Sequence, residues 1–343
     1  MLVITTAISG SGRNEYLEKV KEHALSHGKK IKIYPVGDMI LEHANAIGVR
    51  LTPENVLNAN PSVTNSVRSA VFERITKELP RALNENHAVV INIHAMFFWK
   101  KVFQRAWDNY YVSQLNPGMF ITFLDDADKV RKKLKSRKQW EATNLSLEEV
   151  MLWGNVEVET TAGWAEMMRQ LHYVVPVSAP ATLLHRLMFE PKTDTVYLSM
   201  PLTHAYEPEV QKKVDRLAEE LHKYFIVFDP RYIDPLASSN GKKINMAIYN
   251  QVVNRDLYWL IRQSHRVIAY FPKIVLSAGV INEIREAYET QKEVWLIWPR
   301  GESISPFVTY YVHKIFRSIP ELLSFLSSSL KNKSKSASHK RKE

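Results

Sequence analysis

Short apolar runs and longer amphipathic segments alternate along the chain. Five of the runs are rich in β-branched or aromatic residues, as buried strands are: 2–6, 195–200, 225–228, 265–271 and 293–298. The segment 208–224 carries apolar residues at positions 210, 214, 217 and 221, the spacing of one helix face. Repeated strand and helix units of this length predict an α/β fold, with parallel sheets covered by helices on both faces.

The alternation also predicts two domains, for which 343 residues suffice. We expect a first domain over 1–187, a linker at 188–193, a second domain over 194–330 and a disordered basic tail at 331–343. In the first domain the pattern predicts a last strand at 174–177 and helices over 15–27, 128–139, 144–153 and 162–171. In the second domain it predicts helices over 208–224, 244–264, 281–291 and 307–325.

Composition adds few constraints. The chain is 45% hydrophobic and 24% charged, which is ordinary for a globular protein. Because it has no apolar run of about 20 residues and no signal-like start, we expect a cytoplasmic protein without membrane contact. The absence of cysteine excludes disulfides, cysteine nucleophiles and thiolate metal sites.

The charge is uneven. Residues 331–343 hold six Lys or Arg and one Glu, which is half of the net charge of +10. Such a tail is most simply a solubilising segment. The alternative is a weak, salt-dependent attraction to nucleic acid.

A glycine-rich turn follows the first predicted strand. Residues 7–14 read AISGSGRN, and an amphipathic helix comes next. Strand, glycine turn and helix is the context of a phosphate-binding loop, because backbone N–H groups and a helix N-terminus then face an anion. The pattern Gly-x4-Gly-Lys-Ser/Thr is matched in part, since Ala7, Arg13 and Asn14 replace its first glycine, lysine and hydroxyl residue. The predicted nucleotide-binding residues of this loop are Gly10, Ser11, Gly12, Arg13 and Asn14.

Three further pieces extend this reading: 37–39 (GDM), 91–95 (INIHA) and 117–126 (PGMFITFLDD). With the turn, they make the first half resemble the archaeal-type adenylate kinases and related P-loop nucleotide kinases. The resemblance implies a P-loop NMP-kinase-like α/β domain that binds ATP or another nucleotide. It also implies that Asp38 contacts an acceptor nucleotide, although Asp38 alone fits a helix N-cap equally well. By the same resemblance, Arg131 or Arg137 belongs to a lid over the donor phosphates.

The first half of the chain lacks residues that usually help to hold Mg²⁺ in these kinases. The kinases usually carry Asp where this chain has Asn92, and neutral Asn14 and Asn92 are poor partners for Mg²⁺. We therefore interpret the first domain as a degenerate P-loop fold that binds a nucleotide and does not transfer phosphate. The alternatives are a structural remnant and an active nucleotide kinase.

A second candidate site lies at 277–288 (SAGVINEIREAY). It follows the apolar run 267–271, so Glu283 is predicted in the first turn of a helix, beyond the C-terminal end of a strand. Open α/β sheets bind ligands there. The simple reading is that Glu283 interacts with the helix dipole. The alternative is a nucleophile held in a cleft.

The order of four pieces favours the nucleophile: 195–201 (TVYLSMP), 229–230 (DP), 254–264 (NRDLYWLIRQS) and 277–288. As an ordered set they resemble the nucleoside 2-deoxyribosyltransferases and the related 2′-deoxynucleoside 5′-phosphate N-hydrolases. The resemblance implies a doubly wound, flavodoxin-like parallel α/β domain, often with a site built across a homo-oligomer. It assigns Glu283 as the nucleophile on C1′, with Tyr197 near the sugar and Asp256 holding substrate. Its substrate-binding residues are Ser277, Gly279 and Asp229. Within the family, the sequence Ser-x-Gly-Val favours a 5′-monophosphate substrate.

The implied reaction needs no cofactor. A carboxylate near C1′ stabilises an oxocarbenium-like state and then captures the sugar, and a second acid such as Asp256 assists the leaving base. Glu286, one helical turn along, competes with Glu283 for the role. The predicted function is an enzyme of nucleotide metabolism that cleaves or exchanges the N-glycosidic bond of deoxynucleosides or their 5′-monophosphates. The alternatives are an NMP kinase and a non-catalytic nucleotide sensor.

Overall fold

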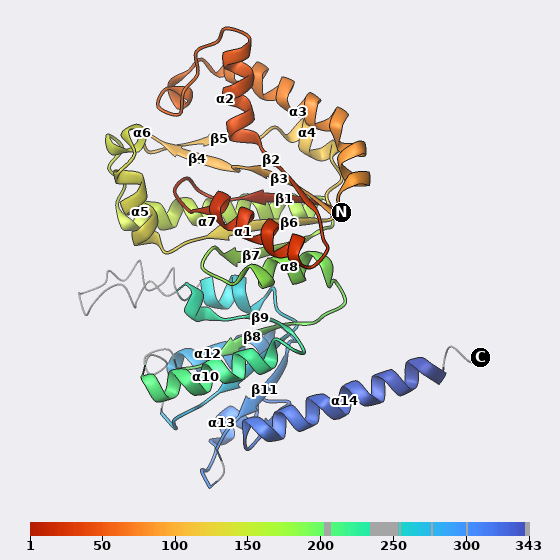
Figure 1. Cartoon of the computed structure of the whole chain (residues 1–343). Coiled ribbons are helices and arrows are strands. Elements are labelled where there is room, and N and C mark those ends of the chain that lie inside the picture. Colours follow the sequence, from red (N-terminus) through yellow and green to blue (C-terminus); the bar gives the residue numbers. More distant parts are fainter. Residues whose placement is uncertain (202–206, 234–252, 254, 276, 300, 340–343) are drawn as a thin grey trace. The chain divides into compact units, whose positions relative to one another are not determined.

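The computed structural model describes residues 1–201, 207–233, 253, 255–275, 277–299 and 301–339. It divides into two compact units, one built on Met1–Met188 and the other on Phe189–Arg231 and Val252–Glu343. Each unit is a parallel sheet with helices packed on it, which confirms the predicted α/β fold (Figure 1). The long helix predicted at 244–264 lies largely outside the described residues.

The first unit is built on five parallel strands in the order β2-β3-β1-β6-β7. The strands are β1 (Leu2–Thr6), β2 (Ile31–Pro35), β3 (Ala88–Ile93), β6 (Met119–Leu124) and β7 (Leu171–Pro176). β1 is buried along its whole length and lies between β3 and β6. The loop that follows β1 therefore leaves from the middle of the sheet, where ligands bind in such folds.

Helices and one hairpin complete this unit: α1 (Arg13–Ser26), α2 (Val36–Ala46), α3 (Pro61–Glu85), α4 (Asn109–Gln114), α5 (Ala127–Lys135), α6 (Lys138–Glu141), α7 (Leu147–Met167), α8 (Ala181–Phe189), β4 (Met96–Trp99) and β5 (Val102–Arg105). Two predicted helices, 144–153 and 162–171, form the single helix α7. A capping box of Ser146 and Glu149 starts α7, and its two interior glycines, Gly154 and Gly163, cost only about 1 kcal/mol each, too little to end it. The predicted basic helix 128–139 is divided between α5 and α6.

The second unit also has five parallel strands, in the order β12-β11-β10-β8-β9. They are β8 (Thr195–Ser199), β9 (Ile226–Phe228), β10 (Arg266–Tyr270), β11 (Glu293–Ile297) and β12 (Lys314–Phe316). Numbered along the chain, the order is 2-1-3-4-5, the doubly wound arrangement of flavodoxin-like folds. The predicted fold of this unit is confirmed.

Its helical elements are α10 (Pro208–Leu221), a short 3₁₀ turn (Pro230–Tyr232), a π-helical segment (Arg255–Ile261), α12 (Ala278–Glu289), α13 (Pro306–Thr309) and α14 (Ile319–His339). The helix predicted over 307–325 is wrong, because β12 interrupts it and pairs with β11. The residues before and within β12, 310–316 (YYVHKIF), are aromatic and β-branched and favour a strand. α14 is helical through 331–339, where disorder was predicted; this stretch has no Gly or Pro to stop a helix.

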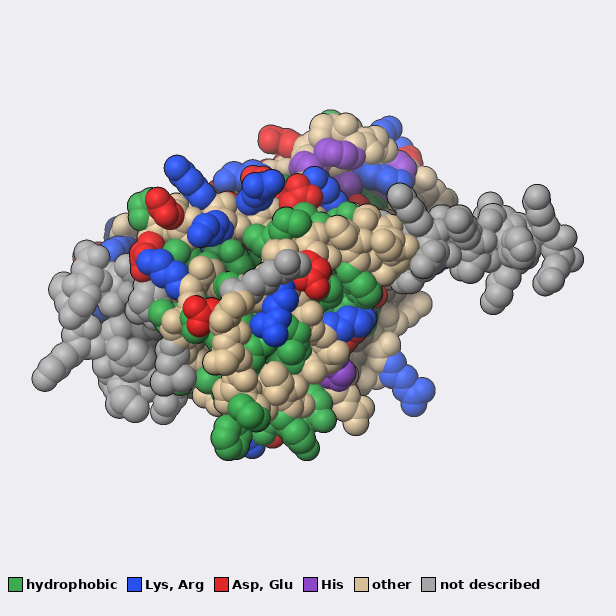
Figure 2. Space-filling model, turned by 90° about the horizontal axis from the view of Figure 1, so that it is seen from below, with side chains coloured by type: hydrophobic (Ala, Val, Ile, Leu, Met, Phe, Trp, Pro, Cys, Tyr) green, Lys and Arg blue, Asp and Glu red, His purple; other side chains and the backbone are tan. Residues whose placement is uncertain are grey.

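The surface carries charges of both signs. In Figure 2, Lys and Arg side chains are interspersed with Asp and Glu, and hydrophobic side chains are exposed between them. Among the helices that the structure describes, none has the length and apolar character needed to cross a membrane.

Candidate functional site

The glycine-rich loop of the first unit has the backbone of an anion site. Gly10 and Gly12 adopt φ values of 82° and 80°, in the left-handed region that favours glycine. Gly12 is the N-cap of α1 and provides no side-chain cap, so the first N–H groups of this helix can face an anion. A Cβ at Gly12 would lie 3.2 Å from Lys133 Nζ, which places a lysine of α5 beside the loop. Lys133 also pairs with Asp125 at 3.1 Å.

Arg13, at the position of the P-loop lysine, turns its guanidinium toward the protein. Nη1 donates to the carbonyl oxygens of Ala7, at 3.0 Å, and of Ile93. Burial lowers the pKa of Arg13 to about 10, and the nearby charges of Glu157 and Asp38 act in the opposite direction. The guanidinium is charged at neutral pH, but one of its nitrogens is committed to backbone carbonyls rather than to a phosphate.

The two asparagines that replace metal-binding residues bond to each other. Asn92 Nδ2 donates to Asn14 Oδ1 at 2.8 Å, and Thr5 Oγ1 donates to Asn92 Oδ1 at 3.2 Å. The register Thr5↔Asn92 between β1 and β3 brings these groups together. A hard dication prefers carboxylate oxygens, so this pair does not fit Mg²⁺. The loop itself fits a nucleotide phosphate.

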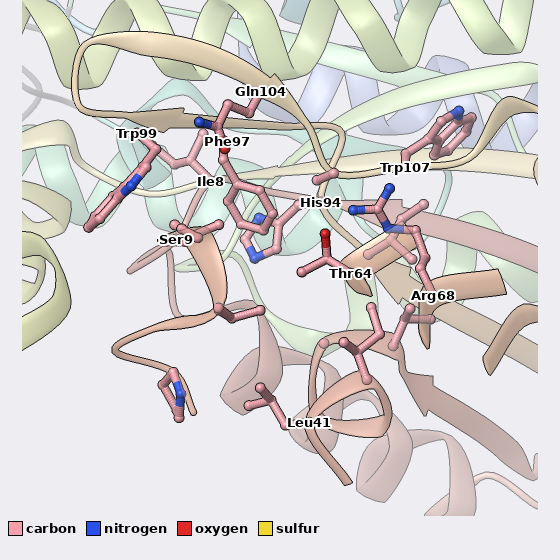
Figure 3. Close-up of a pocket in the computed structure, with 18 of the residues that line it drawn as sticks. Ile8, Ser9, Leu41, Thr64, Arg68, His94, Phe97, Trp99, Gln104 and Trp107 are labelled. Carbon is pink, nitrogen blue, oxygen red and sulfur yellow. The ribbon is translucent and has the colours of Figure 1, made fainter. Parts of the chain in front are cut away.

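A cavity of 1230 Å³ opens beside the loop. It is lined by all five predicted loop residues and by Asp38 and Arg137. Asp38 lies in the first turn of α2, whose N-cap is Pro35, so the N-cap reading of Asp38 is wrong. The other predicted lid residue, Arg131, pairs with Asp128 at 2.7 Å. Figure 3 shows further side chains of the cavity, including Arg68 and His94.

In the second unit, Glu283 lies where α12 follows β10. Its carboxylate is buried, with 8% of the residue exposed. Tyr197 Oη donates to Glu283 Oε1 at 3.0 Å, and Ser199 Oγ donates to Oε2. Tyr197 and Ser199 are two residues apart on β8 and therefore share one face of the sheet. β8 lies between β9 and β10, so this cluster sits at the point where the strand order reverses, where doubly wound folds bind ligands.

Asp256 and Arg255 complete the electrostatics of this cluster. Arg255 donates through Nε and Nη2 to Asp256 Oδ1, at 2.9 and 2.8 Å, and both residues are buried. Burial is the main cause that raises the pKa of Glu283 to about 8, and the negative charge of Asp256 raises it further. The hydrogen bonds from Ser199 and Tyr197 act in the opposite direction. Burial and Glu283 raise the pKa of Tyr197 well above 10, so its hydroxyl stays a donor. The cluster therefore holds a buried carboxyl group that binds its proton more tightly than an ordinary glutamate.

The remaining predicted residues have separate partners. Ser277 is the N-cap of α12 and accepts from Val280 N at 3.4 Å, and Gly279 is in the first turn. Asp229 is bonded by Arg231 through Nε at 3.0 Å and Nη2 at 2.6 Å. Glu286 pairs with Arg262 at 2.9 Å, which separates it from the hydroxyl groups that bind Glu283.

Two members of the cluster escaped prediction. Ser199 could have been found from its two-residue spacing to Tyr197 within one strand, since alternate strand residues share a face. Arg255 directly precedes Asp256, but adjacency in sequence does not show that two side chains pair.

Comparisons with known proteins bear mainly on the first unit. Residues 6–150 match a family model described as an AAA domain. This match includes the glycine-rich turn after β1, and the first unit is an α/β domain with a P-loop. No curated protein matches the sequence.

Three solved structures are similar to parts of the chain. The CMP N-glycosidase BcmB from Clostridium botulinum is 19% identical, with a TM-score of 0.27, over 39% of this chain and 98% of its own. A conserved protein from Enterococcus faecalis V583 is 13% identical, with a TM-score of 0.31, over 40% and 99%. A shikimate kinase from Bacteroides thetaiotaomicron is 10% identical, with a TM-score of 0.34, over 55% and 98%.

Proposed function

We propose that the chain is an enzyme of nucleotide metabolism that cleaves the N-glycosidic bond of deoxynucleosides or their 5′-monophosphates, with Glu283 as the nucleophile. One observation carries the proposal. A buried carboxyl group with a raised pKa is held by two hydroxyl donors at the ligand-binding edge of a doubly wound sheet. Titratable groups perturbed in this way, at such a place, are typical of active sites.

The proposed reaction has two displacements. Glu283 first gives its proton to water and attacks C1′. The C1′–O bond forms as the C1′–N bond breaks, and the base leaves with that electron pair and takes up a proton from water. Water, or a second base, then displaces Glu283 from C1′ and restores the carboxylate. Tyr197 and Ser199 orient the attacking oxygens.

Asp256 has two candidate roles: holding the sugar hydroxyl groups and donating a proton to the leaving base. We propose the first role, because proton donation would require breaking the ion pair between Asp256 and Arg255.

We assign the phosphate of a monophosphate substrate to Ser277 and the backbone of Gly279 at the start of α12. Asp229, fixed by Arg231, is a further substrate contact in this proposal.

The first unit binds a nucleotide in this proposal and does not transfer phosphate. A nucleotide kinase is the second candidate, favoured by the P-loop cavity. It ranks lower because Arg13 is committed to backbone carbonyls and the Asn14–Asn92 pair offers no carboxylate to Mg²⁺. Formation of diphosphates from ATP, Mg²⁺ and an NMP would favour the kinase instead.

The test is chromatographic. The protein is incubated with each deoxynucleoside and each 5′-monophosphate, with and without an added base, and released or exchanged base is measured. We expect Glu283→Gln to lower the rate at least about 10³-fold, because the amide cannot attack C1′. The matched control is Glu289→Gln, on the same helix and paired with Arg285 at the surface, which should leave the rate unchanged. Equal release by the Glu283→Gln protein would refute the proposal.

A further inference from the structure

The π-helical segment of the second unit brings an arginine close to Glu283. Arg255 is the first residue of this segment and is buried, with 6% of the residue exposed. Burial raises the pKa of Glu283 and of Tyr197, and the positive charge of Arg255 opposes both shifts. Among the described residues, Arg255 forms no hydrogen bond with either group. Its charge therefore acts on the cluster from a short distance rather than by direct contact with the carboxylate.

The hydrogen bonds of Arg255 leave part of its guanidinium available. Nε and Nη2 donate to the same oxygen, Asp256 Oδ1, at 2.9 and 2.8 Å. These bonds use two of the five N–H groups of a guanidinium, and Nη1 has no acceptor in the described part of the chain. The ion pair also fixes the orientation of the guanidinium plane. Arg255 is thus a rigidly held, charged donor with N–H groups that a ligand can use.

The proposed reaction needs such a donor for its leaving group. When the C1′–N bond breaks, its electron pair moves onto the base. The acceptor next to the glycosidic nitrogen, O2 in a pyrimidine or N3 in a purine, then shares the negative charge. The leaving nitrogen lies on the far side of C1′ from the attacking oxygen, so a donor to the base must stand apart from Glu283. Arg255 meets this requirement, whereas an ionised Asp256 can only accept hydrogen bonds.

We propose that Arg255 is a further catalytic residue of this site, which donates from Nη1 to O2 of a pyrimidine or N3 of a purine as the base leaves. The inference rests on the proposed N-glycosidic reaction. Arg255 transfers no proton, because a guanidinium stays charged at neutral pH. The electron pair of the C1′–N bond goes to the base, the hydrogen bond from Arg255 stabilises the resulting anion, and water then protonates it.

The test compares two leaving groups in single-turnover base release by the full chain. For a pyrimidine substrate, the second compound is its 5-fluoro analogue, whose base leaves more readily as an anion. For a purine substrate, it is the 7-methyl analogue, whose base leaves without a negative charge. We expect Arg255→Gln to slow release of the ordinary base about 10²- to 10³-fold, the usual loss for one preorganised donor. The loss for the activated base should be at least about fivefold smaller, because that base needs less stabilisation.

A purely structural role of Arg255 gives a different result. Its removal also leaves the charge of Asp256 uncompensated near Glu283, but this effect acts on the nucleophile and slows both substrates equally. Arg255→Lys retains a charge for Asp256 without the planar fork, and it should lose part of the rate with the same dependence on the leaving group. The matched control is Arg262→Gln, which removes an arginine paired with Glu286 and should leave both rates unchanged.

The outcomes separate this inference from the proposed function. A larger loss for the ordinary base, in a chain that Glu283→Gln inactivates, supports both. Equal losses for the two leaving groups, or a parental rate from Arg255→Gln, would overturn the inference and leave the proposed reaction in place. A parent protein that releases neither base would refute the proposed function and this inference with it.

Discussion

Each unit buries one glutamate with a raised pKa, and the two glutamates differ in their partners. Glu157, on α7 of the first unit, accepts from the backbone N–H groups of Ala95 and Met96, both at 2.8 Å, and lies near the charge of Arg13. Glu283 accepts from two side-chain hydroxyl groups and lies near the like charge of Asp256. Burial raises the pKa of Glu157 to about 7 and that of Glu283 to about 8.

The two buried glutamates therefore differ in their partners rather than in their burial. Backbone donors cannot rotate away, so they hold Glu157 to the segment between β3 and β4, and Arg13 lies nearby to balance its charge. Hydroxyl groups can rotate, and the like charge of Asp256 opposes ionisation of Glu283. We infer that Glu157 has a structural role, holding the segment between β3 and β4 in place. We infer that Glu283 instead exchanges its proton and reacts.

The largest expected effect comes from removing the hydroxyl groups. Tyr197→Phe combined with Ser199→Ala should lower base release at pH 7 by about 10²- to 10³-fold, the usual loss for preorganised donors. Both bonds favour the ionised form of Glu283, so their loss leaves less of the nucleophile and orients it poorly. Steady-state rates measure the effect, with Tyr224→Phe as the control. A double variant with the parental rate would make the cluster merely structural.

The next effect concerns Glu157 and stability. Its folded pKa of about 7 lies above the ordinary 4.5, so the folded state binds more protons between these values. The contribution of Glu157 to the free energy of unfolding should therefore fall by up to about 3 kcal/mol as pH rises from 4.5 through 7. Glu157→Gln, in a Glu283→Gln background that removes the second buried glutamate, should remove this contribution from the pH dependence.

Calorimetry between pH 5 and 8 measures that slope. Glu85→Gln, an exposed carboxylate of α3, is the control and should retain the parental pH dependence. If Glu157→Gln melts with an unchanged slope, burial does not oppose the ionisation of Glu157 and the comparison of the two glutamates is wrong.

The smallest expected effect is a shift in the pH profile. Glu283 attacks as a carboxylate, so activity should rise with pH through its pKa of about 8. Asp256→Asn removes the like charge that raises this pKa, and the rising limb should move to lower pH by about one unit. The pH profile of kcat/KM reports the pKa values of groups in the free enzyme. A limb that stays in place, or moves upward, would exclude coupling between the two carboxyl groups.

Much of the fold could be predicted from the sequence because the strands are short, apolar and separated by amphipathic helices. The five strands of the second unit illustrate where this succeeds and fails. Four were predicted, whereas β12 was assigned to a helix. The conformation of this three-residue strand is determined by its pairing with the neighbouring strand rather than by the local sequence pattern. The hairpin of β4 and β5 was missed for the same reason.

The residues of the candidate site were predictable where a local sequence motif marks them. Glu283 after a strand and Tyr197 within one were found from motifs, and the structure brings them within 3.0 Å. The direction of the Arg13 side chain was not predictable, because the carbonyls that bind it belong to Ala7 and to Ile93, 80 residues away.

In the proposed reaction, Glu283 forms a covalent bond to the sugar. The most direct measurement is peptide mass analysis after acid quenching of the protein during turnover of a substrate found active in the chromatographic test. We expect the peptide containing Glu283 to gain the mass of the sugar, or of the sugar phosphate, and the Glu283→Gln protein to gain none. Base release without an adduct on this peptide, at a rate that Glu283→Gln does not change, would contradict it.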